Sequence, residues 1–243
     1  NSAYSTTQFW DGRSPDLEDQ AEGPVQNPIE MAHTLEGVEN KLKVDVSYQT
    51  AFNEAYGSKE VTYERIGKAI ASFERTVLSG NSPFDRYFYE KDRSALDASA
   101  RRGLKIFRDP KKGNCAACHT IEAEFALFTD NKFHNLGVGA EFDGTYKDVG
   151  RFEVSRDIAD TGAFKTPTLR NIAQTAPYMH DGHLKTIKDV VDFYVGGGNS
   201  NDHLDAEIRS LDFLTGQDRA DLVAFLQSLT SELPPNVGPL EKN

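Results

Sequence analysis

Two cysteines and a histidine within five residues restrict what this chain can fold into. They stand in the segment Cys115-Ala116-Ala117-Cys118-His119, and the chain has no other cysteine. Cys-x-x-Cys-His is the attachment sequence of a c-type haem: both thiols bond to the porphyrin, and the adjacent histidine is the proximal iron ligand. The motif therefore predicts one covalently bound haem c, held by Cys115 and Cys118, with His119 on the iron.

Two other interpretations of the motif are weaker. A zinc half-site needs a second pair of ligands at short spacing, and no further cysteine exists to supply it. A thioredoxin-like dithiol needs a strand before the motif and a helix that starts at it. Here a helical pattern precedes the motif, so the sequence favours haem.

Length and charge narrow the class of protein. The 243 residues suffice for one large domain or for two domains of roughly 100–150 residues. The net charge of −11 argues against binding to nucleic acid or to an anionic membrane. No apolar run approaches the roughly 18 residues of a membrane span. The polar start at Asn1 shows no signal peptide, so we expect that a leader was removed or that the natural start lies upstream.

Helical patterns dominate the first third of the chain. Apolar residues recur at near-helical spacing over residues 38–56, which Gly57 follows as a stop signal, and again over residues 63–78. Residues 81–92 are charged and turn-rich, and we interpret them as the connection between two structural units.

The second unit shows helices at both of its ends. Asp97 is a plausible N-cap for a helix that ends near Asp109, and Thr215 with Asp218 resembles a capping box for the last helix. Another helix is expected over residues 186–195. Strand signals are few, so the predicted fold class is mostly α, a c-type cytochrome fold with long ordered loops. The apolar faces of the two terminal helices are Ala100, Gly103, Leu104 and Phe107, and Leu222, Phe225, Leu226 and Leu229.

A single haem leaves the sixth iron position to be assigned, and spacing alone does not choose among the candidates. These are Met179, His134, His180, His183, His203 and Tyr194.

Several segments match one family in order along nearly the whole chain. They are Phe9-Trp10-Asp11-Gly12-Arg13, Arg102-Gly103-Leu104-Lys105-Ile106-Phe107, Phe133-His134-Asn135, Phe164-Lys165-Thr166-Pro167-Thr168-Leu169-Arg170-Asn171-Ile172-Ala173 and Ala176-Pro177-Tyr178-Met179-His180-Asp181-Gly182. With these segments the chain resembles the bacterial di-haem cytochrome c peroxidases and their relative MauG.

The resemblance implies a particular division of the chain. The family carries one haem in each half, and the first is attached upstream of the Trp10 segment. Residues 1–92 are therefore expected to be the rear part of the N-terminal, peroxidatic domain, a helical remnant whose own haem c belongs to an upstream segment. Residues 93–243 are expected to be the C-terminal haem domain.

The resemblance also implies roles for individual residues. Trp10 matches the tryptophan between the two haems, and Gln20, Pro24 and Glu30 match the peroxide-side pocket of the absent haem. In the family Glu30 would handle protons, which requires a carboxyl group positioned near the peroxide.

Two further positions concern metals. Tyr194 falls where ordinary peroxidases of the family carry a methionine ligand to iron and MauG carries a tyrosine. A phenolate is a hard anion that favours ferric iron, whereas a thioether favours ferrous iron. A calcium ion is expected at the main-chain carbonyls of Thr175 and Pro177, although Ca²⁺ needs six to eight oxygens in all.

Three functions follow as hypotheses. The first is a MauG-like, peroxidase-type haem oxidoreductase that uses hydrogen peroxide, with the C-terminal haem carrying electrons or storing oxidising equivalents for a protein substrate. The second is a peroxidase that reduces hydrogen peroxide with electrons from a small redox protein. The third is a mono-haem electron-transfer module. A homodimer is left open, and a periplasmic location follows from haem attachment outside the cytoplasm.

Overall fold

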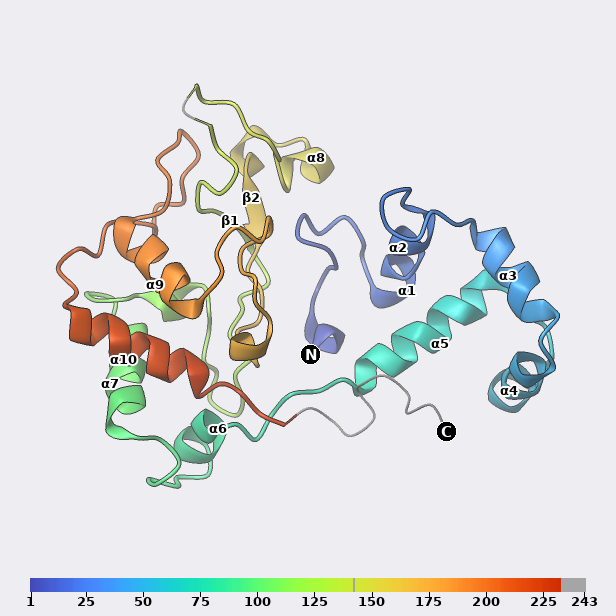
Figure 1. Ribbon diagram of the computed structural model, residues 1–243, viewed down its shortest axis with the longest axis horizontal. Coiled ribbons are helices and arrows are strands. Elements are labelled where there is room, and N and C mark those ends of the chain that lie inside the picture. Colours follow the sequence, from blue (N-terminus) through green and yellow to red (C-terminus); the bar gives the residue numbers. More distant parts are fainter. Residues whose placement is uncertain (142, 233–243) are drawn as a thin grey trace. The chain divides into compact units, whose positions relative to one another are not determined.

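The computed structural model describes residues 1–141 and 143–232, and Figure 1 shows their arrangement. The chain divides into two compact units. The smaller one contains Ser2–Phe9 and Ser14–Val77; the larger one contains Asn1, Trp10–Arg13 and the residues from Leu78 onward. Helices dominate both units, and the only described strands form one short pair, so the expected mostly α fold is confirmed.

The smaller unit consists of helices joined by short turns. They are the 3₁₀ turn η1 (Ser2–Tyr4) and the helices α1 (Leu17–Gln20), α2 (Glu22–Gln26), α3 (Leu35–Lys43), α4 (Val46–Tyr56) and α5 (Tyr63–Thr76). Its core is small: Val25, Phe52, Val61, Tyr63 and Ile66.

The single helix expected over residues 38–56 of this unit is two helices, α3 and α4. The apolar pattern over residues 38–56 is interrupted because the Asp45 carboxylate accepts a hydrogen bond from the Ser47 amide at 2.8 Å and starts α4 as its N-cap. Gly57 ends α4 as expected, in the left-handed region with φ of 68°.

The larger unit holds the remaining elements. They are α6 (Pro83–Phe88), α7 (Ala98–Arg108), η2 (Cys115–Ala117), β1 (Phe133–Asn135), α8 (Phe152–Ser155), η3 (Ile158–Asp160), β2 (Ala163–Lys165), η4 (Ile172–Gln174), α9 (Ile187–Gly196) and α10 (Gly216–Gln227). The strands β1 and β2 are antiparallel, with Phe133 opposite Lys165.

The helices α7 and α10 pack against each other in this unit (Figure 1). Their backbones approach so closely that a Cβ at Gly103 would overlap the carbonyl oxygen of Asp221. Beside this contact the Arg102 guanidinium binds the buried Asp221 carboxylate through two hydrogen bonds, at 2.6 and 2.7 Å. The caps predicted from Asp97 and from Thr215 with Asp218 are both present.

The expected connection over residues 81–92 contains a helix. Ser82 and Asp85 form a capping box at the start of α6, and the fully buried Phe84 packs into the core of the larger unit. The Arg170 guanidinium binds the Asp85 carboxylate at 2.8 and 2.9 Å. Because these contacts tie α6 to the larger unit, the division in the structure falls after Val77, earlier than the expected boundary after residue 92.

In residues 1–141 and 143–232 no helix combines the length and apolar character that a membrane span requires.

Candidate haem-binding site

A cavity of about 400 Å³ lies within the larger unit, and its volume is typical of a cofactor site. Its walls are mostly apolar and come from α7, α9, α10 and the segment that follows β2. Both cysteines and His119 of the motif line it, whereas Ala116 and Ala117 do not. Apolar lining residues include Phe107, Leu136, Val138, Val191, Leu222 and Leu226.

The turn η2 brings the motif to this wall. Asn114 precedes it in the left-handed region with φ of 52°, and the His119 amide donates to the Cys115 carbonyl at 2.9 Å. Neither cysteine forms a disulfide. Burial raises the pKa of the Cys115 thiol to about 12, so this thiol is held neutral inside the cavity.

The His119 ring is oriented by the backbone. Its Nδ1 lies 2.8 Å from the carbonyl oxygen of Phe128, which can only accept, so Nδ1 carries the proton. Burial lowers the pKa of His119, which favours the neutral ring. Nε2 then keeps its lone pair, the arrangement that a metal-bound histidine requires.

Two non-histidine candidates for the sixth iron position also line the cavity. The Tyr194 hydroxyl has no hydrogen-bond partner among residues 1–141 and 143–232, and burial, followed by the charges of Cys115 and Cys118, raises its pKa. A phenol in such surroundings normally finds a partner, so Tyr194 is open to a ligand within the cavity. Met179 lines the cavity too and has an uncommon φ of 68°.

The histidine candidates separate into three cases. Both ring nitrogens of His134 bind carboxylates, Nδ1 that of Asp205 at 2.6 Å and Nε2 that of Asp130 at 2.9 Å, which leaves no lone pair for iron. His180 lines the cavity and stacks on Phe164 with 3.6 Å between ring centroids. His183 and His203 do not line the cavity.

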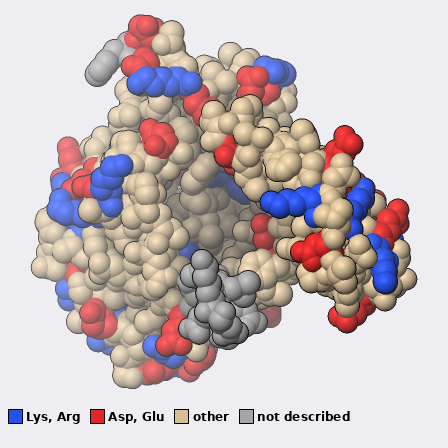
Figure 2. All heavy atoms as spheres, turned by 45° about the vertical axis from the view of Figure 1, so that its right-hand side comes forward, with Lys and Arg blue, Asp and Glu red and all other residues tan. Residues whose placement is uncertain are grey.

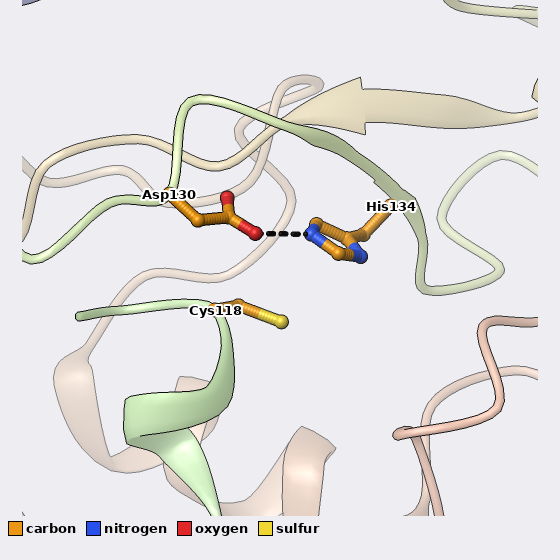
Figure 3. A group of neighbouring side chains, drawn as sticks. All are labelled: Cys118, Asp130 and His134. Atoms are coloured by element: carbon orange, nitrogen blue, oxygen red, sulfur yellow. Dashed lines mark hydrogen bonds and ion pairs between the residues drawn. The ribbon is translucent and has the colours of Figure 1, made fainter.

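His134 also belongs to the group drawn in Figure 3, in which ligand atoms of Cys118, Asp130 and His134 lie within 4.8 Å of one another. Contact with Cys118, then with Asp205 and Asp130, raises the pKa of His134 to about 10. A structural zinc site uses four ligands, and this ring is already bound to two carboxylates. The group therefore lends the zinc alternative little support.

The donor set fits a haem c. Two cysteines and an imidazole whose Nδ1 carries the proton line one largely apolar cavity, and a half-buried phenol with no hydrogen-bond partner among the described residues lines it too. These are the groups that thioether attachment and axial ligation need.

The residue matched to the tryptophan between the haems and those matched to the peroxide side belong to different units. Trp10 belongs to the larger unit, where it lines the cavity with 42% of its surface exposed and accepts a hydrogen bond from the Lys165 amide at 2.8 Å. Gln20 ends α1, Pro24 lies in α2, and the exposed Glu30 accepts a hydrogen bond from Asn27 at 2.7 Å. The last three all belong to the smaller unit.

The two residues matched to a calcium site, Thr175 and Pro177, are exposed and line the same cavity as the motif. The sequence did not single out three residues that shape this region: Phe128, whose carbonyl orients His119, and Asp130 and Asp205, which bind His134. No spacing signal links Asp205 to His134, because 71 positions separate them.

Comparison with known proteins shows which families the chain matches. Residues 1–94 match the family described as di-haem cytochrome c peroxidase, and residues 100–230 match the cytochrome c family. The methylamine utilization protein MauG of Methylorubrum extorquens is 39% identical, over 96% of this chain and 63% of its own. The cytochrome c551 peroxidase of Nitrosomonas europaea is 36% identical, over 96% of this chain and 64% of its own.

A solved structure is similar as well. The crystal structure of a MauG-like protein associated with microbial copper homeostasis has a TM-score of 0.84 at 30% identity, covering 96% of this chain and 75% of that one. The chain spans less than two thirds of the length of the two relatives above. In sequence and in fold, it belongs to the family of bacterial di-haem cytochrome c peroxidases and MauG proteins.

Proposed function

We propose that the larger unit binds one haem c through thioether bonds to Cys115 and Cys118, with His119 Nε2 as the proximal iron ligand. The observation that carries this is that both cysteines and the oriented His119 line the same cavity. When bound, the haem supplies reversible one-electron chemistry at its iron. The apolar residues of the cavity keep water away from it, and the Phe128 carbonyl holds the His119 ring in place.

Tyr194 is the proposed distal ligand. Its hydroxyl has no hydrogen-bond partner among the described residues, and the partial burial of Tyr194 raises its pKa, so its phenolate needs a cation nearby to form. His134 is bound to Asp130 and Asp205 and does not compete for the iron. A phenolate ligand favours the ferric state over the ferrous state.

The activity we propose is that of a MauG-like haem oxidoreductase, which uses hydrogen peroxide to oxidise a protein side chain or another bulky donor. Family membership supports it, and Tyr194 in place of a methionine favours it over simple turnover with a small cytochrome. The second candidate, a peroxidase supplied with electrons by a small redox protein, is supported by the 36% identity to a cytochrome c551 peroxidase.

We place the peroxide reaction in the N-terminal, peroxidatic half of the whole protein. Residues 1–92 are the proposed rear part of the peroxidatic domain, beside a second haem c attached to an upstream segment. Gln20, Pro24 and Glu30 line its peroxide pocket, with Glu30 moving protons, and Trp10 passes electrons between the two haems. The position of Trp10 on the wall of the cavity supports this role.

Two further features complete the proposal. A calcium ion binds the main-chain carbonyls of Thr175 and Pro177, with other oxygens supplied from outside this pair. The protein is exported to the periplasm, since c-type haem is attached outside the cytoplasm.

Replacement of the distal ligand tests the proposal. In the haem-loaded protein, Tyr194→Met should raise the reduction potential, because a neutral thioether favours ferrous iron. Tyr178→Phe is the matched control: Tyr178 also lines the cavity, but its hydroxyl already donates to the Ile172 carbonyl at 2.9 Å. A potential and optical spectrum left unchanged by Tyr194→Met would refute ligation by Tyr194, and an absence of peroxide-dependent oxidation by the full-length protein would favour the electron-transfer module.

A further inference from the structure

A second concavity of the larger unit, of about 490 Å³, is strongly basic although the chain as a whole is acidic. We call it the basic pocket. Arg101, Lys105 and Arg108 contribute to it from α7, at positions i, i+4 and i+7, and therefore share one helix face. The remaining lining residues are Tyr87, Phe88, Lys91, Arg93, Leu104 and Asp109.

The cations of the basic pocket are not neutralised internally. None of its five lysines and arginines forms an ion pair with a carboxylate among residues 1–141 and 143–232, whereas the neighbouring Arg102 is paired with Asp221. The single acid of the pocket, Asp109, accepts a hydrogen bond from the Lys111 amide. On the face of the molecule shown in Figure 2, by contrast, acidic and basic side chains are interspersed.

Aromatic rings form part of the pocket wall and hold several cations in place. Lys91 Nζ lies 5.7 Å and Arg108 Cζ 5.4 Å from the centre of the Phe88 ring, and Arg93 Cζ lies 5.6 Å from that of Tyr87. Such contacts stabilise the cations without cancelling their charge. The pocket thus combines fixed positive charge with half-buried aromatic rings, Tyr87 and Phe88, and aromatic residues and arginine are enriched at protein interfaces.

Short contacts connect this pocket to the proposed proximal histidine. The Phe88 ring stacks on Phe84 with 5.2 Å between centroids, and Phe84 packs against Phe128 at 5.1 Å. The Phe128 carbonyl in turn binds His119 Nδ1 at 2.8 Å. A redox protein seated in the basic pocket would lie at the outer end of this continuous series of contacts.

We propose that the basic pocket docks the acidic face of a small redox-protein partner. The inference rests on the proposed haem function, and it specifies that the redox protein which docks on the larger unit presents an acidic surface. Opposite charges steer such encounters and raise the association rate most at low ionic strength.

The test uses two forms of one probe that differ in charge: native mitochondrial cytochrome c, which is basic, and the same protein with its lysines succinylated, which is acidic. Association with the immobilised haem-loaded protein is followed without peroxide. We expect the acidic form to bind with a rate that falls as salt is added, and the basic form not to bind. The triple variant Arg101→Glu/Lys105→Glu/Arg108→Glu should slow association about 10- to 100-fold at low salt.

Two further variants keep the test decisive. The milder Arg101→Gln/Lys105→Gln/Arg108→Gln should give an intermediate rate, and Lys59→Glu, a single charge reversal at an exposed lysine of the smaller unit, should leave the rate unchanged. Equal binding of both probe forms, or an unchanged rate in the triple variant, would overturn the proposal. So would saturable binding of inorganic phosphate without any binding of the acidic probe, which would indicate a small-anion site. Because no peroxide is present, failure of the proposed catalytic activity alone does not alter this readout.

Discussion

The two units of the chain differ in how they bury their side chains. The larger unit encloses a cavity and holds two bidentate ion pairs: Arg170 with Asp85, both buried, and the half-exposed Arg102 with the buried Asp221. The smaller unit closes over a few apolar residues, and its helix α3 contains no buried residue at all. Large apolar side chains are exposed there, including Ile29 at 91% and Met31 at 62%.

This difference separates two sources of stability. The smaller unit depends on limited apolar burial of its own helices, and exposed apolar surface of this kind often marks a site of interaction. The larger unit depends on specific geometry: a tight helix crossing, buried charges with fixed partners and a cavity shaped for a cofactor. Substitutions should therefore cost far more in the larger unit than matched substitutions in the smaller one.

Removal of haem attachment should produce the largest effect, and this effect should be confined to the larger unit. The double variant Cys115→Ala/Cys118→Ala should lose the haem stain that otherwise stays with the denatured chain. It should destabilise the larger unit by at least about 4 kcal/mol, the linkage value for a ligand at 1,000 times its Kd. Hydrogen exchange resolved by segment should show faster exchange in the larger unit only. Stain that stays with the denatured variant would contradict thioether attachment.

A smaller effect is expected at the crossing of α7 and α10. Gly103→Ala places a methyl group against the Asp221 carbonyl, and such overpacking costs about 1–3 kcal/mol in the free energy of unfolding. The matched control is Gly67→Ala in α5, where the new Cβ would lie 3.3 Å from the Glu18 carbonyl oxygen and alanine's helix propensity offsets the contact. Denaturant titration of both variants measures the contrast, and equal losses would show that the crossing is not tight.

The pH dependence of stability compares the ion pairs of the two units. Hydrogen bonds from Arg102, Ser99 and Gln217 lower the pKa of Asp221 to about 2, with the bonds from Arg102 as the largest cause. A lowered pKa stabilises the fold above the pKa of the unfolded chain, about 3.9, and that contribution disappears as the pH falls towards 2. Asp221→Asn should cost about 1–3 kcal/mol at pH 7 and flatten this acid transition.

The control for the ion-pair comparison is the pair formed by Glu18 and Arg75 in the smaller unit. It has the same two-fold hydrogen bonding, at 2.8 Å for both contacts, but its carboxylate is partly exposed, whereas the Asp221 carboxylate is buried. Glu18→Gln should cost less than about 1 kcal/mol, because solvent screens the pair. Thermal unfolding at pH 7 and pH 3 measures both variants, and a larger loss for Glu18→Gln than for Asp221→Asn would contradict the comparison.

Structural features that depend only on residues close together in the sequence could be predicted from the sequence. Caps at Asp97 and Thr215, the stop at Gly57 and the haem motif each depend on neighbours within about four positions, so local spacing was sufficient. The break between α3 and α4 was missed because the apolar pattern continues across it, while one side-chain cap at Asp45 ends it.

Contacts between distant residues were decided by the tertiary structure. Sequence alone determined that this chain is mostly helical and carries one haem motif, because helix signals and the attachment motif are local. Only packing could show that Phe128 orients His119 and that Asp130 and Asp205 remove His134 from the candidate ligands. Packing alone also shows that Tyr194 lines the cavity with no hydrogen-bond partner in the part of the chain that the structure describes. The pair of Arg170 and Asp85, 85 positions apart, likewise assigns α6 to the larger unit. Such contacts form only after burial brings the groups together, and no spacing in the chain records them.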